Sequence, residues 1–313
     1  MSAEAVSIAR AAEADLPEIL ALNRLIQPHL KRSLELLLWQ YFQTPARDSR
    51  IYLAREPQTK SLIASYGAVS QWLQVGSARV KGWMIQDVMT HPDYRGKGLL
   101  HTLAAVCFEE MKRLDIAGYT FPNERSQMSF SRIGWKRAAL VPSREVELRA
   151  GHSRSPFTLT PVPVDDLASA GTIWGESGLP LGVARDAEFL AWRYRKPGER
   201  YTLCSDGRDY VAALKLFDGP DGRALHVLDL YTRRTVQSRV PELLAACLDF
   251  GVQQGAVRAT AWLPADHPYA AAFDANGLAL KERPERFFYT HFPATVAVPP
   301  PYWHLTQGDS DVY

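Results

Sequence analysis

The sequence predicts an α/β protein in which one domain plan is used twice, and three observations support this. The chain has 313 residues and is 46% hydrophobic, enough for two ordinary cores. A Leu-x-Trp-x-Tyr motif followed by proline occurs at 37–45 and again at 190–197. In each half, strand-like runs flank a stretch of helical periodicity. We therefore expect two tandem domains, 1–150 and 151–313, each a mixed, mostly antiparallel sheet flanked by helices.

The two flanked stretches are predicted to be amphipathic helices at 99–114 and 240–252. Apolar residues at helical spacing in the first are Leu99, Leu103, Val106, Cys107, Met111 and Leu114. Its solvent face is expected to carry Glu109, Glu110, Lys112 and Arg113. The second repeats the pattern with Val240, Leu243, Leu244, Cys247, Leu248 and Val252, and Gly255 is a suitable stop.

Composition excludes several classes of function. With 36 basic and 34 acidic residues the net charge is only +2, so no broad field favours nucleic acid or an anionic membrane. There is no membrane-length apolar run and no signal-peptide pattern, which predicts a cytoplasmic protein. The three cysteines stand singly and the eight histidines form no ligand pair, so we expect reduced, buried thiols and no metal site.

The most informative segment, 86–100, has the pattern of a strand, a basic glycine loop and a helix start. Gly96 and Gly98 allow the backbone to approach an anion, while Arg95 and Lys97 add positive charge. The free amides of the following helix would point at a phosphate. The alternative is a solvated basic turn before an ordinary helix.

Two common phosphate loops do not fit this segment. A P-loop needs Ser or Thr after Gly-Lys, but Gly98 follows Lys97. A dinucleotide fingerprint needs a third glycine where His101 stands. The segment instead resembles the acyl-CoA loop of the GNAT acetyltransferase superfamily, Gln/Arg-x-x-Gly-x-Gly/Ala. Residues 95–100 fit all but the last position, which is Leu100.

The resemblance continues on both sides of the loop and covers residues 7–149. Residues 8–22 resemble the first strand and helix of that superfamily. Asn123 resembles its strand-end asparagine, and 130–135 resembles its closing helix before Gly-Phe or Gly-Trp. The resemblance implies two tandem GNAT-like domains.

The resemblance also implies acetyl-CoA as the acyl donor. Its pantetheine arm would pair with the strand backbone and its pyrophosphate would sit on the loop. The implied cofactor-binding residues are Val88, Met89, Thr90, Arg95, Gly96, Lys97, Gly98, Leu99, Leu100, His101 and Asn123. The alternative for Asn123 is a turn residue at the strand end.

Acyl transfer requires a neutral amine, so a general base is expected. The candidates are Asp87 on the strand and Glu124 after it, although Asp229 holds the place of Asp87 in the second half, which favours a supporting role. Many relatives place a tyrosine where Phe130 stands. The groups left to protonate the leaving thiolate are Ser129, Ser131, Tyr119 and water.

We expect the second half to keep the fold without the cofactor site. Its segment 233–241 has no glycine, and Pro241 offers no amide to an anion. We expect Arg193 and Arg195 to be solvated and the linker to fall at 151–156. The aromatic tail, 299–311, is expected to dock either on the second domain or near the acceptor cleft.

The sequence thus predicts an N-acetyltransferase that transfers an acetyl group from acetyl-CoA to an amine of a small molecule or sugar by direct attack in a ternary complex. The alternative is a non-catalytic CoA-binding regulatory or scaffold protein, suggested by the missing tyrosine and the altered second half. No motif reports the acceptor or the oligomeric state.

Overall fold

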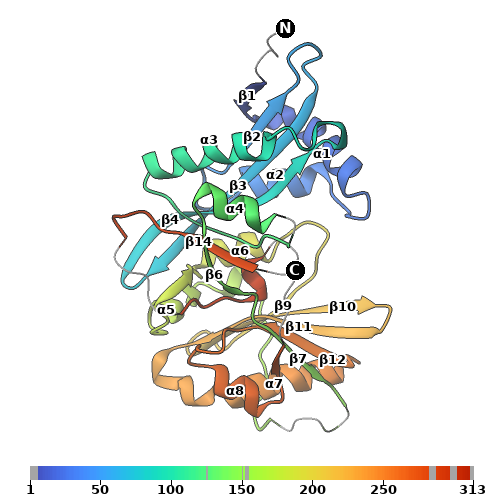
Figure 1. The fold of residues 1–313 in the computed structure, drawn as a ribbon. Helices are drawn as coiled ribbons and strands as arrows, with labels where there is room; N and C mark the ends of the chain where they lie inside the picture. The colour runs from blue at the N-terminus through green and yellow to red at the C-terminus, as the bar shows by residue number, and fades with distance from the viewer. Residues whose placement is uncertain are drawn as a thin grey trace. The chain divides into compact units, whose positions relative to one another are not determined.

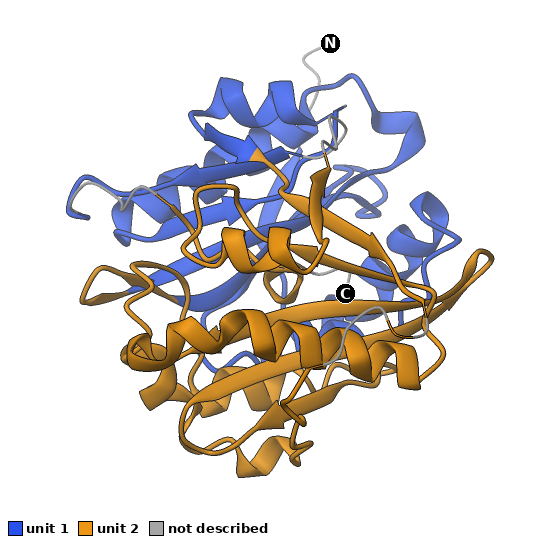
Figure 2. Ribbon diagram, turned by 90° about the horizontal axis from the view of Figure 1, so that it is seen from below, with its two compact units in different colours: residues 1–72, 80–139, 285–297 blue, residues 73–79, 140–284, 298–313 orange. Residues whose placement is uncertain are grey.

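The computed structural model describes residues 6–124, 126–149, 151, 155–281, 287–296 and 302–310. The chain forms two compact units, the first within 1–72, 80–139 and 285–297, the second within 73–79, 140–284 and 298–313 (Figure 2). Each unit is a mixed, mostly antiparallel sheet flanked by helices, as predicted (Figure 1).

The first unit is organised on the strand order β1-β2-β3-β4-β5-β14-β6. Its strands are β1 (Ser7–Arg10), β2 (Arg50–Arg55), β3 (Leu62–Val75), β4 (Ala78–Thr90), β5 (Ala117–Thr120), β6 (Lys136–Leu140) and β14 (Phe287–His291). Its helices are α1 (Leu16–Ile26), α2 (Leu34–Phe42), α3 (Leu99–Arg113) and α4 (Gln127–Ile133). The far end of β3, residues 73–75, pairs with β8 (Leu181–Val183) and belongs to the second unit.

The second unit is organised on the order β13-β7-β12-β11-β10-β9. Besides β8, its strands are β7 (Ser143–Glu147), β9 (Thr202–Ser205), β10 (Tyr210–Gly219), β11 (Gly222–Thr232), β12 (Arg258–Trp262) and β13 (Ala279–Lys281). Its helices are α5 (Ala170–Gly175), α6 (Ala187–Arg193), α7 (Val240–Gln253) and α8 (Ala270–Ala275).

The two sheets exchange one strand each. β6 and β7 are consecutive in the chain, yet β7 pairs with β12, so that Ser143 lies opposite Trp262. Likewise β13 stays in the second sheet, whereas β14 pairs with β5, with Tyr289 opposite Thr120. The compact units are therefore not two consecutive halves of the sequence, and the division at residue 150 stays a prediction about the repeated segments.

The predicted helix faces hold with three corrections at α3 and its C-cap. Its buried face includes Leu103, Cys107 and Met111, each at most 1% exposed. Val106 and Leu114, both expected in the core, are 39% and 41% exposed, Leu114 because the helix ends at Arg113 before it. Glu110, expected on the solvent face, is buried. Glu110 is buried because it accepts a hydrogen bond of 2.6 Å from the Tyr52 hydroxyl and pairs with Arg10, which satisfies its charge.

Candidate functional site

The strands β4 and β5 pair in parallel and then part, which creates a fork in the first sheet. The register runs from Gly82 opposite Ala117 to Ile85 opposite Thr120, where β5 ends. β4 continues to Thr90, and in the part of the chain that the structure describes no other strand takes the place of β5 beside it. The backbone edge of this stretch can therefore pair with an extended ligand.

A kink in β4 lies in this fork at Asp87, whose φ is +49°. That conformation is unfavourable for a residue other than glycine and must be held by its surroundings. The carboxylate accepts hydrogen bonds from Arg32 at 2.8 Å, Gln40 at 2.6 Å and the Tyr41 hydroxyl at 2.9 Å. Burial and the neighbouring carboxylate raise the pKa of Tyr41 well above its usual range, so the phenol stays protonated. Arg32 and α2 thus clamp the kink.

The loop after β4 has the backbone conformation that its glycines predict. A 3₁₀ turn, Pro92–Tyr94, leads into Gly96 and Gly98, whose φ angles are +75° and +77°. No atom lies within 4 Å of where a Cβ would stand at either glycine. Glycine is therefore needed here for backbone conformation, and the space beside the loop is open.

The helix α3 begins directly at this loop with backbone amides available for an anion. Its first main-chain bond runs from the Thr102 amide to the Gly98 carbonyl at 3.0 Å, and no side chain caps the helix. The amides of Leu99, Leu100 and His101 therefore lack intrahelical acceptors, a favourable arrangement for a phosphate.

The side chains around the loop are arranged as an anion site requires. Arg95 and Lys97 are exposed, and the Lys97 ammonium lies 4.4 Å from the Tyr94 ring centroid. Leu99 is buried beneath the loop, whereas Leu100 and His101 are half-buried. On the strand, Met89 is buried and its neighbours Val88 and Thr90 are partly exposed.

The segment after β5 holds three other predicted residues. The Asn123 side-chain oxygen accepts hydrogen bonds from the Ser126 amide at 3.1 Å and its hydroxyl at 3.2 Å, as in a turn that opens α4. Glu124 is exposed and Ser129 is half-buried. The structure brings these residues into one turn and helix but shows no contact that assigns them a catalytic role.

Phe130 stands at the position of the missing tyrosine, and the structure shows the surroundings of the hydroxyl groups considered in its place. Phe130 is buried against Trp135. Tyr119 is fully buried and donates to the Gln71 side chain. The Ser131 hydroxyl lies 3.1 Å from that of Tyr289, a residue of β14 that sequence reasoning did not single out.

In the second unit a different structure follows the equivalent strand. β11 leads into a 3₁₀ segment, Arg234–Arg239, and then α7 with Pro241 in its first turn. Because this segment has neither glycines nor a full set of free amides, it differs from the first loop in the way the sequence predicts.

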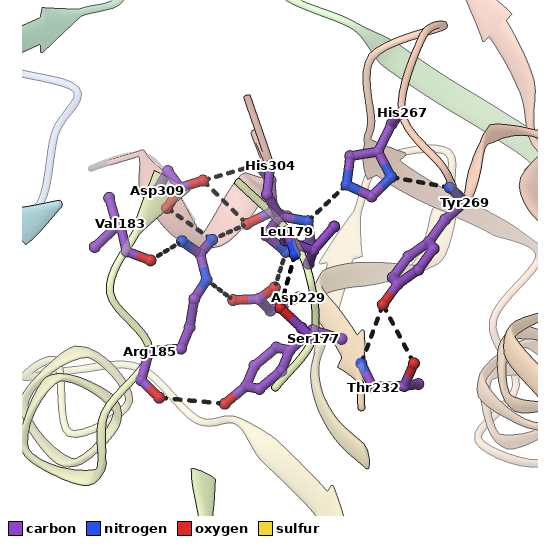
Figure 3. A network of polar contacts seen from close by, with 12 residues as sticks. Ser177, Leu179, Val183, Arg185, Asp229, Thr232, His267, Tyr269, His304 and Asp309 are labelled. Atoms are coloured by element: carbon purple, nitrogen blue, oxygen red, sulfur yellow. Dashed lines mark hydrogen bonds and ion pairs between the residues drawn. The ribbon is translucent and has the colours of Figure 1, made fainter. Parts of the chain in front are cut away.

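A buried polar network lies in the second unit (Figure 3). Arg185 pairs with Asp229 at 2.9 Å and with Asp309 at 2.8 Å, and all three are almost completely buried. Attraction to both carboxylates outweighs desolvation and raises the pKa of Arg185 above its usual range. Asp229 is the counterpart of Asp87, and Arg185 that of Arg32, because each arginine stands seven positions before the tryptophan of its motif.

A chain of histidines extends this network. The Tyr269 amide donates to His267 Nδ1, so His267 Nε2 carries the proton shared with His304 Nδ1 at 2.9 Å. His304 Nε2 then donates to Asp229 at 3.0 Å. Burial lowers the pKa of both histidines, which are therefore neutral at neutral pH.

The aromatic tail is an integral part of the second unit. Residues 303–310 are buried there, whereas Asp311 lies outside the described residues. Arg193, predicted to be solvated, is 3% exposed and donates to the carbonyls of Gly308 at 2.7 Å and Ser310 at 3.2 Å. The prediction for Arg193 was wrong because its acceptors come from a segment over a hundred residues away.

The three cysteines are spread over both units. Cys107, Cys204 and Cys247 are all free and buried, as predicted. Among the described residues, no group of three His, Cys, Asp or Glu side chains could hold a metal ion. Within the same residues, no helix has the length and apolarity needed to cross a membrane.

Known proteins share this architecture. Residues 7–138 match the family model of the acetyltransferase (GNAT) domain. No curated protein sequence matches the chain significantly.

Three solved structures are similar over most of their length. A probable N-acyltransferase from Enterococcus faecalis is 12% identical with a TM-score of 0.68, covering 92% of this chain and 73% of that protein. A GCN5-related N-acetyltransferase from Anabaena variabilis is 13% identical with a TM-score of 0.67, covering 92% of this chain and 73% of that protein. Saccharomyces cerevisiae N-myristoyltransferase, with bound myristoyl-CoA, is 11% identical with a TM-score of 0.62, covering 93% of this chain and 83% of that protein. Residues 7–138 therefore match the GNAT acetyltransferase domain, and the chain as a whole shares its fold with these three structures.

Proposed function

We propose that this protein is an N-acyltransferase that moves an acetyl group from acetyl-CoA to an amine of a small molecule or sugar. The observation that carries the proposal is the continuity of the fork, the glycine loop and the uncapped start of α3. In that arrangement, residues 88–90 would pair with the pantetheine arm and the amides of 96–101 would hold the pyrophosphate. The myristoyl-CoA bound to the yeast neighbour supports an acyl-CoA donor.

The reaction proposed is direct attack in a ternary complex. The amine nitrogen attacks the thioester carbonyl, the carbon–sulfur bond breaks, and CoA leaves as the thiol or thiolate. Both Asp87 oxygens already accept hydrogen bonds, which supports a positioning role; Asp87, Glu124 and Ser129 stay predictions as proton-transfer groups. Phe130 in place of tyrosine favours the second candidate, a CoA-binding scaffold without turnover.

A pair of glycine variants tests cofactor binding. Gly98→Glu adds negative charge at the proposed pyrophosphate site, whereas Gly207→Glu adds the same residue at a turn of the second unit with φ +73° and equally open surroundings. Because both substitutions carry similar backbone strain, strain alone cannot separate them.

The expected result is that acetyl-CoA raises the Tm of the wild type and of Gly207→Glu but not that of Gly98→Glu. Acetyl-CoA-dependent CoA release with an amine panel then separates enzyme from scaffold. No Tm shift in the wild type at concentrations far above micromolar would contradict both candidates.

A further inference from the structure

One buried side chain in the fork has no hydrogen-bond partner among the described residues. Gln86 is the first residue of β4 beyond the last rung shared with β5. It is 8% exposed, and among the described residues neither its amide oxygen nor its amide nitrogen has a hydrogen-bond partner. An unsatisfied buried polar group costs roughly 1–3 kcal/mol, so this side chain would be selected against unless something binds it.

The position of Gln86 places it beside the proposed reaction centre. Alternation along β4 puts its side chain on the face of Met84, which lies opposite Tyr119. The Gln86 carbonyl and the Tyr41 hydroxyl both approach Gly67 closely, at 2.8 and 2.1 Å from where its Cβ would stand. Gln86 is also next to Asp87, at the kink of the fork.

The second half shows what fills the corresponding place. Leu228 is the counterpart of Gln86 there, and the chain's own tail packs against it. A Cβ on Gly308 would stand 3.1 Å from the Leu228 carbonyl and 3.0 Å from the hydroxyl of Tyr194, the counterpart of Tyr41. Gln307 reaches the Thr260 hydroxyl on β12 at 3.0 Å. In the second half, where the tail fills the fork, this position is therefore apolar. In the first half the same position carries a polar amide.

We propose that Gln86 binds the amine acceptor, an inference that rests on the proposed function. A primary amide presents an acceptor and a donor side by side. Its matching ligand is an amine that carries an oxygen on the neighbouring carbon, such as a vicinal amino alcohol or a 2-amino sugar. Gln86 Oε1 accepts the amine N–H, and Nε2 donates to the neighbouring oxygen.

A matched pair of acceptors tests this assignment in the full-length protein. trans-2-Aminocyclohexanol and cyclohexylamine differ by one hydroxyl and are compared at equal free-base concentration by acetyl-CoA-dependent CoA release. The wild type should favour the amino alcohol roughly tenfold in kcat/KM, the effect of about one satisfied hydrogen bond.

Two variants complete the experiment. Gln86→Leu, which installs the residue of the second half, should remove the preference. Ser70→Ala is the control, because Ser70 is fully buried on β3 with an equally unpartnered hydroxyl, and it should keep the preference. Gln86→Leu should not lower the Tm, because it removes an unpaired polar group, so lost preference cannot be attributed to unfolding.

The outcomes separate this inference from the proposed function. The inference is overturned if the wild type has similar kcat/KM values for the two amines, or if Gln86→Leu keeps the wild-type preference. Gln86 is then a structural or water-bound residue. Turnover of neither amine overturns it as well. Two independent measurements test the proposed function. If acetyl-CoA shifts the Tm of the wild type and the amine panel gives CoA release, only the inference fails. If either result is absent, the proposed acyltransferase function fails.

Discussion

The two forks of this molecule share a clamp and differ in what lies beside it. In each half an arginine pairs with an aspartate on the strand, Arg32 with Asp87 and Arg185 with Asp229. In the first half the strand leads to a glycine loop, whereas in the second it leads to a proline-containing helix start and residues 307–308 of the tail fill the fork. The clamp is therefore part of the scaffold, and the loop and the contents of the fork distinguish the halves.

The largest expected effect comes from breaking the clamp of the second half. Arg185→Leu leaves Asp229 and Asp309 buried without their cation, a change expected to cost about 3–5 kcal/mol. Arg32→Leu leaves one carboxylate that keeps two other donors, Gln40 and Tyr41, and should cost less. Urea unfolding of both variants measures the difference. Equal decreases in the free energy of unfolding would show that the tail adds nothing to the stability of the second clamp.

The second comparison concerns pH. Because the folded-state pKa values of His267 and His304 are lowered, the unfolded state binds more protons as pH falls below 6.5. Stability should be fully present above that pH and fall below it by at most about 1.4 kcal/mol per pH unit for each such histidine. The folded-state pKa of Asp309 is raised, so between its unfolded and folded pKa values this group makes stability rise as the pH falls.

His226 also makes stability fall as the pH drops below 6.5, because burial lowers its pKa to about 4. The specific check is therefore His304→Gln, which should make urea stability less dependent on pH between 6.5 and 5 than in the wild type. An unchanged slope would exclude His304 as a contributor.

A smaller effect is expected at Asp87. Asparagine tolerates its positive φ but removes the charge that Arg32 pairs with. If Asp87 positions the kink, Asp87→Asn should weaken acetyl-CoA binding modestly and lower the rate at saturating acetyl-CoA only slightly. A rate decrease above a hundredfold with acetyl-CoA binding unchanged would instead identify Asp87 as the general base.

The sequence predicted local features well and long-range ones poorly. The loop, its glycine conformations and the amphipathic α3 follow from neighbouring residues, so they could be predicted. The strand exchange of β7 and β14 could not, because the pairing partner of an ordinary strand is set by distant residues.

The errors on individual side chains have the same cause. Glu110 and Arg193 were expected in solvent because charged residues usually are, yet Tyr52 and the tail supply buried partners. The Arg–Asp clamp did leave a signal, since Arg32 and Arg185 stand at the same distance before their tryptophans. Gln86 left none, because only the structure shows that its amide is buried and unpaired.

The central claim is that only the first fork binds acyl-CoA. Amide hydrogen exchange with and without acetyl-CoA tests it most directly, because the same experiment observes both halves. The account predicts added protection at 88–90 and 96–102 and none at 230–242. Protection of the second segment, or of neither, would contradict it.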